Sequence, residues 1–186
     1  MIMNVSDWFG LLSTALAIGM IVGAGLKKST LTRRLALTIV VAIASLIPLP
    51  FDICPSLAMV VYAAIGTLSV PLLTILICNL FNVDAPNCRK RCALAAIITG
   101  FILYTGEIGV IPFDLFEVGY NPMHSLAFVI LAILLADNIG AVVFCLAYAL
   151  YIAGIYDNFF ISIIDPVLWI SAIVFLVCQA RISVTK

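Results

Sequence analysis

Five polar or acidic residues stand within or beside long apolar stretches, where they could form a path for an ion. An ionisable side chain at the centre of a bilayer costs about 2.5–3.5 kcal/mol on insertion scales, and such residues often mark ion or proton pathways. Glu107 lies about one helical turn before the end of one apolar stretch, and Asp165 stands directly before Pro166 inside another. The predicted path consists of Glu107, Asp165, Thr67, Ser69 and Asp137.

Both acids at the core of this prediction also have a structural interpretation. Glu107 could reach water at the outer interface of the membrane. Asp165 and Pro166 match the N-cap and the first position of a helix, which would leave residues 159–164 as an interfacial stretch. The sequence favours this capping role for Asp165 over an ion site.

The remaining path residues can equally be structural. Thr67 and Ser69 precede Pro71, and hydroxyls near a proline in membrane helices commonly bond backbone carbonyls. Asp137 is followed by Asn138, a pair that favours a tight turn. For these three residues the sequence therefore favours a structural role in shaping helices over a role in binding a ligand.

A second group of residues could do acid–base chemistry at the membrane surface. Asp114, Glu117 and His124 lie in or beside the loop at 112–122, and His124 is the only histidine. A catalytic histidine needs a nucleophile and an orienting acid nearby, but no nucleophile motif frames Ser125. An enzyme acting on lipid is therefore the least favoured hypothesis, and we expect no catalytic residues.

The six cysteines do not predict a metal or cofactor site. Cys88 and Cys92 are four residues apart with no histidine beside them, and this spacing alone is weak evidence for zinc. Reduced, unliganded thiols are the expectation.

Basic residues gather in two short clusters between apolar stretches. Such clusters attract anionic lipid headgroups at about 1 kcal/mol per residue near the surface, and they can also dock a soluble protein partner. The candidate lipid or partner contacts are Lys27, Lys28, Arg33, Arg34, Arg89, Lys90 and Arg91.

The composition indicates the elements that carry these residues. The chain of 186 residues is 65% hydrophobic and 10% charged, whereas soluble domains are about 45–50% apolar and about 25% charged. Too few charges are present to cover a water-facing surface, and nine basic residues balance nine acidic ones. The sequence therefore predicts an all-α integral membrane protein, a single transmembrane domain over residues 1–186, with no direct nucleic-acid partner.

Runs of about 20 apolar residues define the predicted spans. The stretch at 124–155 is interrupted by Asp137, so it could form one long span or two short ones, which gives six or seven spans in all. The other predicted spans cover residues 8–26, 35–49, 56–81, 93–111 and 159–180.

The distribution of Lys and Arg favours seven spans. These residues concentrate in cytoplasmic loops, and only the seven-span arrangement places all nine on one side. We therefore expect an inner-membrane protein of bacterial type, with its N-terminus outside, its C-terminus in the cytoplasm and its first apolar run kept as a helix.

Two parts of the chain, residues 33–81 and 91–138, resemble each other. Each opens on a basic residue, reaches a Pro-Phe-Asp turn and continues through Ser-Leu-Ala. This pattern predicts one leading helix followed by three helical hairpins. Pro, Asp and aromatic residues are also common at outer turns without any duplication.

These features favour a non-catalytic subunit, an anchor, scaffold or sensor, in a larger membrane-associated complex. The protein would associate with itself or dock a partner on its basic cytoplasmic loops, in contact with membrane lipid. A row of small residues in the first span, Ala15, Gly19 and Gly23, could support contact between helices. A small transporter or channel using Glu107 and Asp165 is the alternative.

Overall fold

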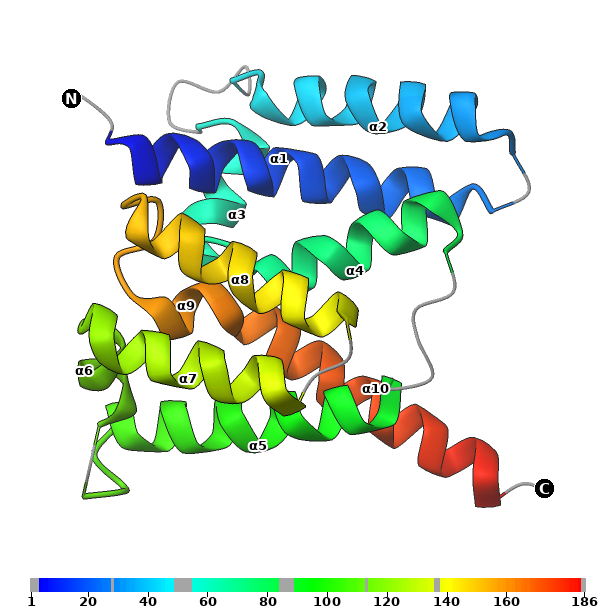
Figure 1. Ribbon diagram of the computed structural model, residues 1–186. Coiled ribbons are helices and arrows are strands. Elements are labelled where there is room, and N and C mark those ends of the chain that lie inside the picture. Colours follow the sequence, from blue (N-terminus) through cyan, green and yellow to red (C-terminus); the bar gives the residue numbers. More distant parts are fainter. Residues whose placement is uncertain are drawn as a thin grey trace. The chain divides into compact units, whose positions relative to one another are not determined.

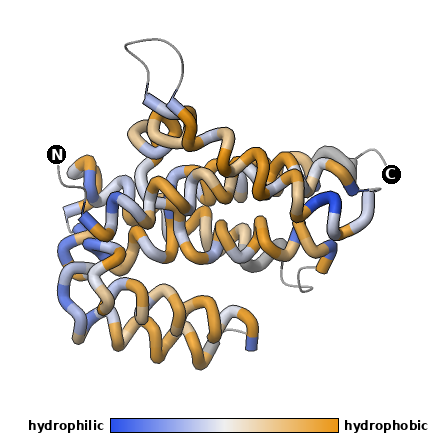
Figure 2. Tube along the Cα trace, turned by 90° about the horizontal axis from the view of Figure 1, so that it is seen from above, coloured by the Kyte–Doolittle hydropathy of each residue, from blue (hydrophilic) through white to orange (hydrophobic). Residues whose placement is uncertain are grey.

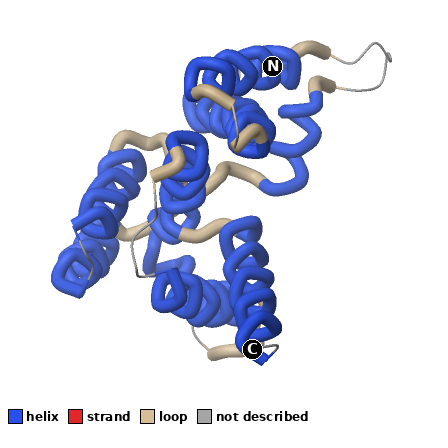
Figure 3. Tube along the Cα trace, turned by 90° about the vertical axis from the view of Figure 1, so that its right-hand side faces the viewer, coloured by secondary structure: helices blue, strands red, loops and turns tan. Residues whose placement is uncertain are grey.

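In the described part of the computed structural model, helices are joined by loops and no strand is present (Figure 3). The structure describes residues 4–27, 29–48, 55–83, 89–112, 114–135 and 138–184. The prediction of an all-helical protein is confirmed for these residues. The chain divides into two compact units, residues 1–68 with 72–85, and residues 69–71 with 86–186.

The first unit is organised around an antiparallel hairpin. It contains α1 (Val5–Gly25), α2 (Leu31–Leu46), α3 (Leu57–Ile65) and most of α4 (Val70–Phe81), with α1 packed on both α2 and α3 (Figure 1). The helices approach closely because Gly19 and Gly23 lack side chains: a Cβ at Gly19 would overlap the carbonyl oxygen of Thr38 on α2. Two members of the predicted row, Gly19 and Gly23, therefore pack against α2 within this chain, while Ala15 lies in a cluster with Ala58 of α3.

The second unit holds the remaining helices. They are α5 (Arg89–Glu107), α6 (Leu115–Gly119), α7 (Pro122–Leu135), α8 (Asn138–Ile152), α9 (Phe159–Ile163) and α10 (Pro166–Val184). Helix α5 packs along α10, α7 packs along α8, and α6 touches α5, α7 and α9. In Figure 1 the end of α5, the start of α7 and the end of α8 lie together at one end of this unit.

Two helices occupy the apolar stretch at 124–155, as the preferred interpretation predicted. The hydroxyl of Tyr148 donates to the carbonyl of Pro122 at 3.2 Å, and that of Tyr151 donates to the carbonyl of Tyr120 at 2.9 Å. These bonds join the end of α8 to the start of α7, so the pair forms a hairpin. Asp137 lies outside the described residues.

Two of the predicted spans are broken into shorter helices. The stretch at 56–81 forms α3 and α4, because Gly66 adopts a φ of +80° that ends α3. The stretch at 159–180 forms α9 and α10, with the extended Ile164 and the non-helical Asp165 between them. Proline at the first position of α10 fits the helix start but cannot continue α9.

Only α1, among the described helices, is long and apolar enough to cross a membrane by itself. One such helix near the N-terminus is weak evidence for a membrane location. The fifteen residues of α8 give a length of about 22 Å, short of the hydrocarbon core of about 30 Å. Figure 2 shows apolar residues along the helices and hydrophilic ones gathered near helix ends.

Candidate functional site

The side chain of Asp165 lies buried where two of the shortened helices begin. It is 1% exposed. Its Oδ1 accepts a hydrogen bond from the backbone N–H of Leu168 at 2.8 Å, and its Oδ2 accepts one from the backbone N–H of Ser69 at 2.6 Å. One carboxylate therefore binds the first turn of α10 and the residue that precedes α4.

The physical reason is the orphan N–H groups at a helix start. The first N–H groups of a helix have no partner within it and carry a partial positive charge, so an anion placed there is stabilised. Asp165 serves α10 as the N-cap that its sequence context predicted. Its bond to Ser69 could not be read from local sequence, because the two residues are 96 positions apart.

Aromatic side chains flank this junction. Trp169 lies one turn after Asp165 on α10, where its indole N–H donates to the carbonyl of Ile97 at 3.1 Å. The rings of Trp169 and Tyr104 lie 5.2 Å apart between centroids. A Cβ at Gly100 would overlap the indole, so this glycine lets α5 pack against α10. Tyr104 is close enough to both Asp165 and Glu107 to interact with their charges.

Two further hydroxyl groups bear on the chemistry of the junction. The Oγ of Ser69 is buried without a hydrogen-bond partner, and its residue is 0% exposed. Tyr156, in the turn before α9, is also buried. Burial first, and then the charge of Asp165, raise the pKa of the Tyr156 phenol, so it stays protonated and neutral.

The structure brings together some residues of the predicted path and not others. Ser69 and Asp165 are in contact. Glu107 is exposed at the last position of α5, and Thr67 is half-buried in the segment between α3 and α4. Asp137 lies outside the described residues. The site is thus a buried junction of Asp165 and Ser69.

The predicted outer-loop residues have separate surroundings. Asp114 caps α6, accepting from the backbone N–H of Phe116 at 2.8 Å. Glu117 and His124 are exposed. Within the described residues, no group of three His, Cys, Asp or Glu side chains could hold a metal ion.

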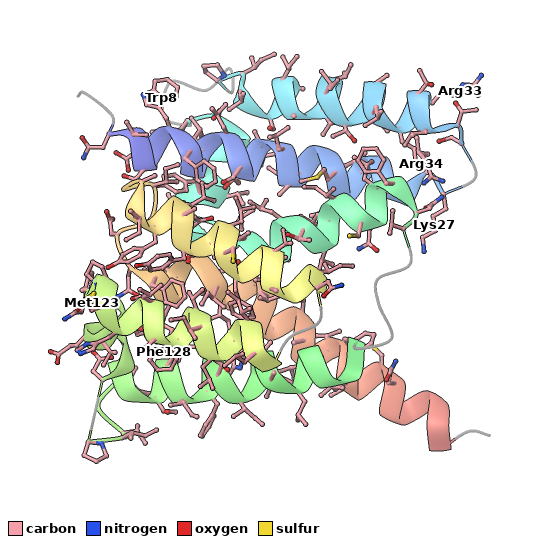
Figure 4. All side chains as sticks on the ribbon, in the orientation of Figure 1. Trp8, Lys27, Arg33, Arg34, Met123 and Phe128 are labelled. Atoms are coloured by element: carbon pink, nitrogen blue, oxygen red, sulfur yellow. The ribbon has the colours of Figure 1, made fainter. Side chains whose placement is uncertain are left out.

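The basic residues of the first unit play two different parts. Arg34 is 3% exposed, and its guanidinium donates to the carbonyls of Leu26 at 3.0 Å, Leu80 at 3.3 Å and Lys27. Lys27 and Arg33 are exposed, and Figure 4 shows both at the turn between α1 and α2. Arg34 therefore binds the ends of α1 and α4, while Lys27 and Arg33 face solvent.

The other candidate contacts are only partly described. Lys28 lies outside the described residues. Arg89, Lys90 and Arg91 open α5, but their side chains are outside the described part.

Sequence reasoning missed Asn158, which organises the turn before α9. It is 0% exposed; its Nδ2 donates to the carbonyl of Phe116 at 2.7 Å, and its Oδ1 accepts from the N–H of Phe160 at 2.8 Å. A Cβ at Gly119 would overlap its amide. The signal available in the sequence was an asparagine directly before two phenylalanines, in the N-cap position of a short apolar run.

Comparison of the chain with protein-family models, with curated proteins and with solved structures finds no match.

Proposed function

We propose that this protein is a polytopic membrane protein of about seven spans that acts as a non-catalytic anchor, scaffold or sensor subunit. It would dock a protein partner or anionic lipid with its basic cytoplasmic end, and its N-terminus would lie outside a bacterial inner membrane. The observation that carries this proposal is the exposed basic turn between α1 and α2.

The start of α2 makes this turn electropositive. Its N-cap residue, Thr30, makes no side-chain capping bond, and the first turn of α2 contains no acidic residue. Uncapped N–H groups and the helix dipole add partial positive charge to that of Lys27 and Arg33. An acidic protein surface or a lipid phosphate would complement this end, whereas Arg34 is already bound to carbonyls and would contribute little.

Charge separation in the second unit supports the same orientation. Basic residues open α5 and follow near the end of α10, while Glu107, Asp114 and Glu117 belong to the opposite end of the unit (Figure 1). Lys and Arg concentrate on the cytoplasmic side of membrane proteins. The basic end of this unit would therefore face the cytoplasm.

The buried hydroxyl groups argue for a structural role of most of the interior. Ser13 and Thr14 both donate to the carbonyl of Gly10, and Ser45 and Ser162 donate to carbonyls three residues back. Hydroxyls satisfied within their own helix leave little free polarity for a wide aqueous path.

The test is affinity purification of the tagged protein in mild detergent, with mass spectrometry and the native mass of the eluted particle. We expect a stoichiometric partner that is lost from a Lys27→Glu, Arg33→Glu double variant. An Asp114→Asn, Glu117→Gln variant, altered at the other end, should retain it. A particle that contains only this chain, or a partner indifferent to the basic residues, would contradict the docking proposal.

A small transporter is the second candidate, and the broken helices favour it. Transporters build ion sites from discontinuous helices whose ends meet near the middle of the membrane. Here α3 and α4, and α9 and α10, are interrupted, and Asp165 joins the second break to the first through Ser69. Ion flux in proteoliposomes that is unchanged by Glu107→Gln and by Asp165→Asn would remove this candidate.

A further inference from the structure

We propose that the outer face of α2, with Arg33 at its start, binds an anionic phospholipid of the bilayer. Arg33 would hold the phosphate of the headgroup, and an aliphatic stripe along α2 would contact the acyl chains. This inference rests on the membrane location proposed above, and it names a lipid ligand for one part of the basic turn. It is carried by the contrast between the side chains that α2 buries and those that it exposes.

Helix α2 turns polar and small side chains inward. They recur every three or four positions, so they form one face of the helix, and this helix packs on α1. No large aliphatic side chain of α2 reaches the same degree of burial. The buried residues of α2 are Arg34, Thr38, Ala42 and Ser45.

The other face of α2 carries large aliphatic side chains in line with Arg33. Val40 and Ile43 are 61% and 58% exposed, and Ile47, the C-cap residue, is 59% exposed. With 3.6 residues per turn, these three residues and Arg33 fall within an arc of about 80°. Arg33 is itself exposed, at the turn between α1 and α2 that Figure 4 shows. One cationic group therefore stands at the end of an apolar stripe.

This distribution is the reverse of that in a soluble protein, where the apolar side of a helix faces the core. In water the stripe would be an exposed apolar patch, which marks an interaction site. A bilayer supplies hydrocarbon for the stripe, and a lipid phosphate supplies the negative charge that Arg33 lacks. Arginine binds phosphate through two parallel N–H bonds, which favours it for this contact.

The dimensions of α2 match one leaflet of a membrane. Its sixteen residues give a length of about 24 Å, whereas half of the hydrocarbon core is about 15 Å thick. Val40 and Ile43 lie about 11 Å and about 15 Å along the helix from Arg33. A phosphate bound at Arg33 would therefore place its acyl chains beside both residues.

A second copy of this chain fits the stripe less well than lipid does. Contacts between membrane helices favour small residues, which let the backbones approach closely. In this hairpin Gly19 and Gly23 are already packed against α2, and the outward stripe consists of branched aliphatic residues. The cores of protein interfaces are also enriched in aromatic residues, and α2 contains none.

The experiment titrates the purified full chain in detergent with one of two lipids that have the same acyl chains. Dioleoylphosphatidylglycerol is anionic, and dioleoylphosphatidylcholine has no net charge. Thermal melting and native mass spectrometry report binding. We expect a saturable rise in melting temperature at lower concentrations of the anionic lipid. Arg33→Gln should weaken its binding about fivefold, the effect of one basic residue at an anionic surface, and so reduce the preference for the anionic lipid.

Ile43→Ala tests the aliphatic stripe. It should weaken both lipids alike, because it removes contact with the acyl chains that they share. Ile21→Ala is the matched control, since Ile21 is 60% exposed. On α1 it lies about 200° round the helix from Gly19, which packs against α2. This control should bind both lipids like its parent.

Equal affinities for the two lipids, or an Ile43→Ala variant that binds like its parent, would overturn the lipid site. Inorganic phosphate that raises the melting temperature as much as the anionic lipid would also overturn it, because the acyl chains would then contribute nothing. These results leave partner docking untouched, and Ile43→Ala should still capture the protein partner in affinity purification. A chain that stays in solution without detergent would instead overturn the membrane location on which both proposals rest.

Discussion

Arg34 and Asp165 are both buried charges, one in each unit, and both bind the ends of helices. Arg34 donates to carbonyls at the ends of α1 and α4, where the helix dipole is negative. Asp165 accepts from N–H groups at the starts of α4 and α10, where it is positive. Each charge thus has the sign that its helix ends require.

The difference between them lies in the bonds that each makes. The guanidinium of Arg34 distributes its donors over three carbonyls, as its forked geometry allows. The carboxylate of Asp165 accepts one N–H on each oxygen. Each charge has an unpaired hydroxyl nearby in the chain, Thr38 one turn after Arg34 and Ser69 bonded to Asp165 through its N–H, so neither surrounding is fully satisfied.

The largest expected effect is on Arg34. Arg34→Ala removes three charge-assisted hydrogen bonds and should lower the free energy of unfolding by about 3 kcal/mol. Arg34→Lys keeps the charge but loses the fork, so it should recover about half of this. Thermal unfolding in detergent measures both, with the exposed Arg33→Ala as control; equal melting temperatures for Arg34→Ala and Arg33→Ala would contradict a clamping role.

Asp165→Ala should have the next largest effect. It leaves two buried N–H groups without an acceptor, for a loss of about 2 kcal/mol. Asp165→Asn retains one acceptor oxygen at the helix start, and the expected loss is about 1 kcal/mol. The same unfolding assay gives both values, and an Asn variant as unstable as the Ala variant would show that the charge, and not the cap, holds the junction.

Local sequence rules predicted part of the bonding of Asp165 and none of that of Arg34. Asp165 before Pro166 is a helix-start signature, and the structure confirms it through the bond to Leu168. The bond to Ser69 was out of reach because it depends on a contact between distant segments. Arg34 was assigned to lipid or partner contact with its neighbours, since position within a basic cluster does not reveal which side chain turns inward.

The helices themselves were predicted better than their lengths. Hydrophobic stretches located the described long helices, and the stretch at 124–155 holds two of them, α7 and α8. In the stretch at 56–81 the sequence predicted a polar kink at Thr67, Ser69 and Pro71 within one span, but not that Gly66 ends a helix, because a single glycine is tolerated in many membrane helices. At Asp165 the break was one of two interpretations.

Gly→Ala substitutions near Arg34 and near Asp165 test the packing around each charge, because they add a single methyl group. At Gly23 an added methyl group would meet the Thr38 hydroxyl and the Arg34 carbonyl, and at Gly100 it would meet the Trp169 indole. Overpacking of this kind costs about 1–3 kcal/mol. We expect Gly23→Ala and Gly100→Ala each to lose about 1 kcal/mol in thermal unfolding, with Gly25→Ala, where nothing lies within 4 Å, as control.

Gly100→Ala should also change the fluorescence of Trp169, since the indole must move; a Trp8→Phe background removes the other of the two tryptophans from this signal. Gly23→Ala should leave that fluorescence unchanged. A response to both substitutions would mean that the surroundings of Arg34 and those of Asp165 are not independent.

Tyr156 is expected to have the smallest effect on stability at neutral pH, and its contribution should change at alkaline pH. Burial and the charge of Asp165 raise the pKa of this phenol above its ordinary value near 10. Between the unfolded and the folded pKa the native state holds more protons than the unfolded one, so stability falls as pH rises through this range. We expect the melting temperature to drop above pH of about 10, and to drop less in Tyr156→Phe.

Tyr120→Phe, at an exposed tyrosine, controls for general alkaline effects. In an Asp165→Asn background the alkaline drop assigned to Tyr156 should shrink, because the carboxylate charge no longer opposes the phenolate. An Arg34→Lys background should leave it unchanged, since burial and the charge of Asp165 are the causes of the raised pKa of Tyr156. If the fall of the melting temperature at alkaline pH is the same with and without Asp165→Asn, burial alone raises the pKa of Tyr156. In that case the charge of Asp165 does not influence the turn before α9.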